Sequence, residues 1–205
     1  MEKYDIKVAH RKLYSPSAKE FVIVEVPTLQ YLAMDGHGDP NTSAEYAEAL
    51  EALYPVAYTL KFESKKVLGR DFVVGPLEGL WRADDMTAFT RREKDSWDWT
   101  MLISQPEWIT SEMVAQAIAT VTSKKAIAAA ERVRLETLSE GTSVQILHIG
   151  SYDDEAPTLE RLHTDYFDAH GLTFNGDHHE IYLSDPRRTA PEKLKTILRQ
   201  PVRPR

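Results

Sequence analysis

The feature that most constrains the fold is a strand–helix–strand–strand order of predicted elements, which occurs twice along the 205 residues. The two occurrences span about residues 21–110 and 131–200, and no long linker separates them. Strands and helices that follow one another over short connections favour one mixed domain. The sequence therefore predicts a single α+β domain over residues 1–205, built from two equivalent units with a ligand cleft between them.

Strands are predicted where runs of β-branched and aromatic residues are bounded by turn residues. They cover residues 21–26, 30–34, 71–81, 97–104, 131–138, 142–150 and 178–184. The DGHGDP segment at 35–40 is a turn signal that closes the second strand. Gly75-Pro76 predicts an irregular point in the third.

Helices are predicted from capping residues and apolar spacing. Thr42 and Glu45 stand at capping-box spacing before an apolar helical pattern, and Pro55 within that pattern predicts a kink or a break, because its ring clashes with the carbonyl of Glu51. Three further helices are predicted: one capped by Thr110 or Ser111 and running to about Ala130, one over about 157–169 stopped by Gly171, and a short one that starts at a Thr189–Glu192 capping box and ends at Pro201.

Composition excludes several classes of function. Without any cysteine, the chain cannot use a cysteine nucleophile, a disulfide, a Cys-ligated zinc ion or an iron–sulfur cluster. The net charge of −7 disfavours nucleic acid as a partner and favours a neutral or cationic small molecule. Residues Met1–Asp5 contain no apolar signal segment, and apolar runs such as Phe21–Val24 are far shorter than a membrane span. We therefore expect no membrane partner and a cytoplasmic location.

Two glutamates interrupt segments that otherwise resemble buried strands, and they occupy corresponding places in the two units. Glu180 lies in HHEIYL and Glu78 lies in PLEGLW. On an ideal strand, Glu180 and Tyr182 share one face, and His179 lies on the other. Glu180 and Tyr182 therefore face either solvent or a pocket, and the two alternatives remain open at this point.

Aromatic residues define the chemistry that these glutamates would carry. A carboxyl enclosed by aromatic rings is either a general acid or base, because desolvation raises its pKa, or an ionised group that holds an organic cation. The candidate rings are Tyr54, Tyr58, Trp81, Trp97, Trp99, Tyr152 and Tyr182. Core packing is the alternative interpretation, especially for the tryptophans.

Motifs for metal, nucleotide or serine chemistry are absent from the sequence. His178 and His179 are adjacent on a predicted strand and point to opposite faces, so they cannot both bind one metal ion. Neither an HExxH nor a GxSxG motif occurs. The glycines of Gly36–Asn41 indicate a turn, because the dinucleotide pattern lacks its third glycine and contains Pro40. We expect neither a metal site nor a cofactor.

Four segments carry a resemblance to a known family. PLEGLW, WDWTMLISQP, VQILHIGSYDDE and HHEIYLSDPRR resemble the GyrI-like small-molecule-binding family, in particular its stand-alone bacterial members. The resemblance extends over nearly the whole chain. It implies a duplicated strand–helix–strand–strand fold with a cleft between the halves, which agrees with the pattern of elements above.

The resemblance also implies a function. Family members bind bulky aromatic or cationic molecules, and some stand-alone members hydrolyse strained cyclopropanoid toxins. By resemblance, Glu180 matches the family's central acidic residue, and Tyr182 falls among the expected pocket aromatics. We expect Glu180 to position or deprotonate the attacking water and Tyr182 to hydrogen-bond the substrate or that water. The expected ligand-binding residues are Tyr58, Glu78, Trp81, Trp97, Trp99, His148 and Tyr152.

Two alternatives to a hydrolase remain open. One is a drug-binding, sequestering or sensing module that does no chemistry. The other is an interaction protein whose edge strand binds a peptide. Neither the natural ligand nor the oligomeric state follows from the sequence.

Overall fold

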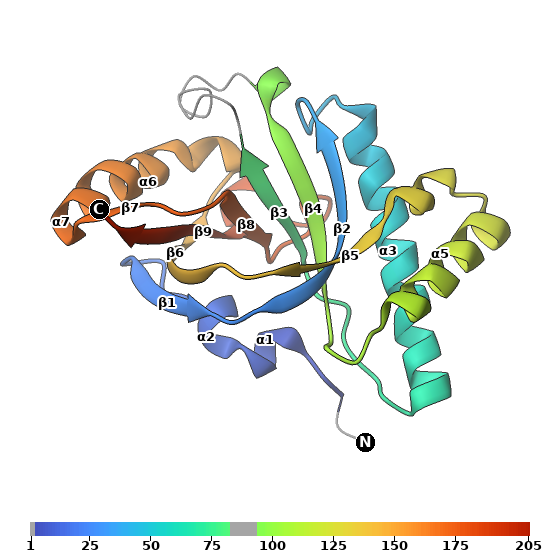
Figure 1. Cartoon of the computed structure of the whole chain (residues 1–205). Helices are drawn as coiled ribbons and strands as arrows, with labels where there is room; N and C mark the ends of the chain where they lie inside the picture. Colours follow the sequence, from blue (N-terminus) through green and yellow to red (C-terminus); the bar gives the residue numbers. More distant parts are fainter. Residues whose placement is uncertain (1–2, 83–93) are drawn as a thin grey trace.

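A nine-stranded antiparallel sheet forms the centre of the computed structural model, which describes residues 3–82 and 94–205 (Figure 1). The strands are β1 (Val22–Val26), β2 (Leu29–His37), β3 (Leu77–Arg82), β4 (Asp98–Gln105), β5 (Arg134–Leu138), β6 (Gly141–Ile149), β7 (Leu172–Phe174), β8 (His178–Tyr182) and β9 (Lys195–Pro204). All seven predicted strands are present with shifted ends, whereas the sequence does not predict β7 and β9.

The described helices flank this sheet. The α-helices are α1 (Ile6–Ala9), α2 (Arg11–Tyr14), α3 (Ala44–Glu63), α5 (Ser111–Lys125), α6 (Ala156–Arg161) and α7 (Phe167–His170). Two π-helical turns, η1 (Ser64–Leu68) and η5 (Leu162–Tyr166), extend α3 and join α6 to α7. The remaining helices are 3₁₀ turns: η2 (Lys94–Ser96), η3 (Ala128–Arg132), η4 (Tyr152–Asp154) and η6 (Pro191–Lys193).

The duplication predicted from the sequence is visible in the order of the strands. That order is β1-β6-β9-β8-β3-β4-β2-β5, so β8 and β3 meet at the middle of the sheet. The first unit is β2, α3, β3 and β4, and the second is β6, the α6–α7 segment, β8 and β9. The two units therefore meet along one central pair of strands, where a ligand cleft is expected.

The ends of the sheet exchange strands between the units. β1 precedes β2 in the chain but pairs with β6, and β5 precedes β6 but pairs with β2. The β2–β5 pairing continues the β1–β6 pairing without a shift in register. Val26 lies opposite Gly141, and Leu29, three residues later, lies opposite Leu138, three residues earlier. This exchange ties each unit to the other at a second place, besides the central β8–β3 pair.

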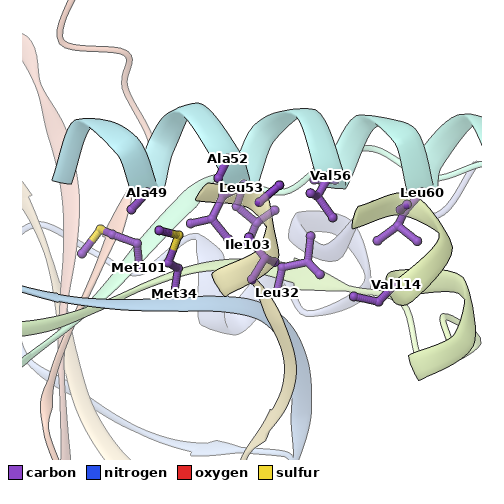
Figure 2. Packing of buried hydrophobic residues seen from close by; sticks show 14 of the residues in the cluster. Leu32, Met34, Ala49, Ala52, Leu53, Val56, Leu60, Met101, Ile103 and Val114 are labelled. Atoms are coloured by element: carbon purple, nitrogen blue, oxygen red, sulfur yellow. The ribbon is translucent and has the colours of Figure 1, made fainter. Parts of the chain in front are cut away.

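The largest hydrophobic core lies between α3 and the first unit's part of the sheet. Leu53, Val56 and Leu60 on α3 are fully buried, and Figure 2 shows them facing Leu32 and Ile103 from β2 and β4. Burying a side chain of this size stabilises a fold by about 1.5–3 kcal/mol. The core fixes α3 against the sheet, so the opposite side of the helix is free to form a cavity wall.

The predicted break at Pro55 is wrong, since α3 continues from Ala44 to Glu63. An internal proline costs about 3 kcal/mol through its missing hydrogen bond and its clash. Buried side chains on both sides of it, among them Leu53 and Val56, offset that cost. The predicted capping box is also absent, because Ser43 is the N-cap residue and the Glu45 carboxylate accepts a hydrogen bond from the His37 amide.

The predicted C-terminal helix ending at Pro201 is wrong as well. Only the 3₁₀ turn η6 follows the Thr189–Glu192 segment, and residues 195–204 form β9. Pro201 is tolerated inside the strand, where it lies opposite Ser143 and its carbonyl accepts a hydrogen bond from the Asn175 amide. Burial of all residues from 196 to 202 stabilises this strand.

Three predicted element ends also need correction. The helix that Thr110 caps ends at Lys125, because Ala126 adopts a left-handed conformation with φ 56°. The strand predicted over 30–34 continues to His37 through the first half of the expected turn. The strand predicted from Asp71 begins only at Leu77, beyond the Gly75-Pro76 irregularity.

Candidate functional site

A cavity of about 1510 Å³ lies above the two central strands. Its floor includes Leu77 and Trp81 from β3 and Glu180 and Tyr182 from β8. One wall comes from α3, and the opposite wall comes from η4, α6 and η5. The cavity is therefore the cleft between the two units, large enough for a bulky ligand.

Hydrogen bonds hold an aromatic and acidic cluster on the cavity floor. Trp81 Nε1 donates to Tyr182 Oη over 2.9 Å, and Tyr182 Oη donates to Glu180 Oε2 over 2.7 Å. Burial, followed by the charge of Glu180, raises the pKa of Tyr182 well above its usual value, so the phenol keeps its proton. The edge-to-face ring of Tyr152, 5.7 Å from the Tyr182 ring centre, completes the cluster. Glu180 is thereby held in one orientation towards the cavity.

Glu155 is a site residue that sequence reasoning missed. It lines the same cavity, it is buried, and its Oε1 has no hydrogen-bond partner among the described residues. Burial and then the charge of Glu180 raise the pKa of Glu155 well above its usual value. The acidic run in SYDDE, directly before the second unit's helix, is the sequence signal that points to this residue. Glu155 and Glu180 form a pair of carboxyls in which one favours the neutral form.

The cavity wall is acidic overall. Among the described lining residues, the acidic ones are Glu51, Asp153, Glu155, Glu160, Glu180 and Asp185, and the basic ones are Lys7, Lys94 and Arg187. Arg187 is itself paired with Asp185 over 2.9 Å. This excess of carboxylates attracts a cation, and the aromatic rings of the wall also favour one.

Six of the residues predicted for the site line this cavity. They are Tyr58, Trp81, Trp97, Tyr152, Glu180 and Tyr182. Trp97 packs edge-to-face on Trp81, with ring centres 5.6 Å apart. Figure 1 shows how far apart their elements lie in the sequence, from α3 through β3 to β8.

Glu78, Trp99 and His148 lie away from the cavity, contrary to the prediction. Glu78 alternates with Leu77 and Gly79 on β3, so its side chain lies on the far face of the sheet, where it is fully buried. Trp99 is fully buried against Gly36 in the main core. His148 is buried on β6, where its Nε2 lies 3.1 Å from the carbonyl of Ser151.

Behind the sheet, Glu78 belongs to a buried network of charges. Glu78 Oε1 accepts a hydrogen bond from Tyr14 over 2.7 Å, and its Oε2 lies 3.0 Å from His179 Nε2. His179 Nδ1 lies 2.9 Å from Glu140 Oε1, and Arg199 Nη1 lies 3.1 Å from Glu140 Oε2. Although burial opposes it, the two carboxylates raise the pKa of His179 to about 9. The network therefore pairs two carboxylates with two cations.

Gly79 allows the cavity cluster to approach the strand. Its register partner is Glu180. A Cβ at this position would lie 2.6 Å from Met101 Cε, 3.0 Å from Trp81 Nε1 and 3.2 Å from Tyr182 Oη. A glycine is therefore required for the indole and the phenol to meet above β3.

No cluster of three or more His, Asp and Glu side chains in residues 3–82 and 94–205 has the arrangement to hold a metal ion. No helix in those ranges combines the length and apolar character that crossing a bilayer requires.

Comparisons with known proteins agree with the geometry. A model of the GyrI-like small molecule binding domain matches residues 19–203. The crystal structure of an uncharacterized conserved protein from Listeria innocua is 38% identical, with a TM-score of 0.90 over 98% of this chain and 100% of that one. A structure described as a hydrolase from Listeria innocua is also 38% identical, with a TM-score of 0.85 over the same shares.

A more distant comparison shows the fold alone. The C-terminal domain of EcmrR is 11% identical, with a TM-score of 0.59 over 91% of this chain and 98% of that domain. A search of curated proteins gave no significant match.

Proposed function

The chain belongs to the GyrI-like small-molecule-binding family, and from this premise we propose that its cavity binds bulky aromatic or cationic molecules and hydrolyses strained cyclopropanoid electrophiles. The observation that carries the proposal is the pair of cavity carboxyls, Glu155 and Glu180, beside Tyr182. The similar Listeria innocua structure described as a hydrolase supports a hydrolytic activity. The cyclopropanoid substrate class comes from the family resemblance.

Binding depends on the walls of the cavity. Tyr58, Trp81, Trp97 and Tyr152 offer ring faces and edges to a planar ligand. Glu180 lies among them, and its charge would stabilise a cationic ring or a positive charge that develops on carbon. A drug-sized aromatic ligand held in this way would bind with micromolar affinity, about −8 kcal/mol.

The chemistry assigns a separate role to each carboxyl. Glu180 accepts a proton from water, and the water oxygen forms a bond to the methylene carbon of the three-membered ring. The carbon–carbon bond to that methylene breaks, and its electron pair moves into the conjugated acceptor, which Glu155 protonates. The neutral form of Glu155 that the raised pKa favours supplies this proton. The proton on Glu180 then returns to Glu155 through solvent, so the net reaction is addition of one water molecule. Tyr182 orients Glu180 for it.

The test is a turnover assay followed by mass spectrometry. The native protein should add one water to a cyclopropanoid compound, and Glu180→Gln and Glu155→Gln should each lower the rate at least about a hundredfold. Glu131→Gln, at an exposed residue outside the cavity, is the matched control and should keep the native rate. Full turnover by Glu180→Gln would contradict the hydrolase mechanism.

A second candidate function is ligand sequestration without chemistry. The excess of carboxylates on the cavity wall favours it, since they attract a cation whether or not a reaction follows. Fluorescence titration with a cationic dye measures this binding directly. Tight binding with unaltered ligand recovered from both native protein and Glu180→Gln would favour sequestration over hydrolysis.

A further inference from the structure

Two histidines line the second unit's side of the cavity, next to the acidic cluster. His163 comes from η5, and His178 comes from β8, two residues before Glu180. His178 is only 4% exposed, and its Nε2 lies 3.4 Å from Glu180 Oε1. The proposed hydrolysis uses neither imidazole.

The ring nitrogens of these histidines are unsatisfied. Within the part of the chain that the structure describes, His163 Nε2 and both His178 ring nitrogens are buried without a hydrogen-bond partner. Buried polar groups in native proteins are nearly always paired, so each exception requires an explanation. Since both side chains line a cavity, a polar group of a bound ligand would satisfy these nitrogens.

Apolar contacts hold the His163 ring in place. Its ring centre lies 4.8 Å from that of Phe174 and 5.6 Å from that of Phe167. Burial and then the nearby His178 lower the pKa of His163 to about 4. His163 is therefore neutral near pH 7 and presents a hydrogen-bonding group without a charge, unlike the carboxylates beside it.

We propose that His163 and His178 form a hydrogen-bonding subsite for a hydroxyl group carried on an aromatic ring of the ligand. A neutral imidazole offers one donor and one acceptor, and a hydroxyl group both donates and accepts. A hydroxyl therefore pairs with the histidines in either tautomer, whereas an ether can only accept. The flanking Phe174 and Leu159 also line the cavity and provide apolar contact for the ring that bears the hydroxyl.

This proposal rests on the proposed function, because it places one part of the ligand relative to Glu180 in the same cavity. The short distance from His178 to Glu180 puts the hydroxyl subsite next to the cationic or electrophilic centre. The expected ligand class is therefore a planar hydroxylated aromatic with a cationic or strained group on the same framework.

Two cationic styrylpyridinium dyes test the subsite. They differ only in carrying a para-hydroxyl or a para-methoxyl on the aryl ring, and they are titrated at mildly acidic pH, where the phenol keeps its proton. The native protein should bind the hydroxyl dye about tenfold more tightly. A His163→Phe/His178→Phe variant should lose this preference and keep its affinity for the methoxyl dye within about twofold. His37→Phe, at an exposed histidine outside the cavity, should leave the preference unchanged.

The controls separate this subsite from the proposed function. Glu180→Gln should lower the affinity for both dyes equally. An unchanged affinity in this variant would contradict cation binding by Glu180. The ratio of the two affinities would still report on the histidines. Equal affinities in the native protein, or a preference that survives in the double variant, would overturn the subsite.

A measurement on the native protein covers the case in which the double variant fails to fold. Nitrogen-15 NMR of the imidazoles should show shifts at His163 and His178 with the hydroxyl dye and smaller ones with the methoxyl dye. Equal shifts with the two dyes would overturn the subsite.

Discussion

Two pairs of glutamates lie on opposite sides of the central β3–β8 pair, and their surroundings differ. Behind the sheet, Glu78 and Glu140 meet the charges of His179 and Arg199 and have almost no exposed surface. In the cavity, no lysine or arginine of the described residues forms an ion pair with Glu155 or Glu180. One network is electrically balanced, and the other is an excess of acid open to a ligand.

Side chains alternate between the two faces of a strand, which explains how neighbouring residues come to belong to the two different clusters. His179 and Glu180 are neighbours on β8, yet one belongs to the balanced network and the other to the cavity floor. A carboxyl that is paired with cations contributes to stability. A carboxyl that lacks such partners keeps a charge available for a cation, or a raised pKa that suits proton transfer. Removing groups from the two clusters should therefore have opposite consequences.

Breaking the balanced network should have the largest effect. Arg199→Met leaves Glu140 and Glu78 with one cation, and we expect a loss of about 3–5 kcal/mol in the free energy of unfolding, measured by urea denaturation. Arg203→Met, at an exposed position on the same strand, is the matched control and should change stability by less than about 0.5 kcal/mol. Equal stability of both variants would show that the network is not a stabilising unit.

The same network should give stability a defined pH dependence. The pKa of His179 is raised to about 9, so its contribution is complete below its ordinary value of 6.5 and is lost as pH rises through 9. The pKa of Glu140, lowered to about 2 because His179 and Arg199 outweigh burial, gives a contribution present above 4.5 and lost as pH falls through 2.

The expected curve has a plateau between these limits. The limb above neutral pH should amount to roughly 3 kcal/mol in the free energy of unfolding. Urea denaturation across the pH range measures it, and His179→Gln should remove that limb. A limb of the same size in His179→Gln would assign it to other groups.

Neutralising a cavity acid should do the opposite of breaking the network. Because the pKa of Glu155 is raised, its contribution is complete below the ordinary value of 4.5, and the native protein loses stability as pH rises above that. Glu155→Gln should match the wild type within about 1 kcal/mol in acid and be more stable than it above neutral pH. A lower stability of Glu155→Gln across the whole pH range would mean that the carboxylate is structurally required.

The sequence predicts most of this arrangement where short-range rules apply. The alternation of side chains on β8 places Glu180 and Tyr182 together and His179 apart, and the structure has them so. The same rule, applied to β3, would have placed Glu78 on the face opposite Trp81. The corresponding positions of Glu78 and Glu180 in the two units do not put both side chains on one face of the sheet.

The remaining errors depend on tertiary packing. Pro201 is a helix terminator in isolation, but a strand whose residues are buried on both faces accommodates it. Glu155 has no sequence motif, and its pKa is raised only in the folded protein, by burial and then by the charge of Glu180 across the cavity. Partners such as Arg199 and Glu140, which are 59 positions apart, are brought together by the sheet and leave no local pattern.

The substitution Gly79→Ala should have the smallest effect, because it changes the cavity cluster without removing any charge. Gly79→Ala places a Cβ 2.6 Å from the flexible Met101 Cε and 3.0 Å from Trp81 Nε1, so the indole must move away from Tyr182. We expect a stability loss of about 1 kcal/mol and a roughly tenfold lower turnover, because the hydrogen bonds that orient Glu180 lengthen. Thermal unfolding and the cyclopropanoid assay measure the two effects.

Leu80→Ala, on the opposite face of the same strand, should lower stability more and turnover less. The reverse ranking would show that the cavity cluster does not depend on the close approach at Gly79.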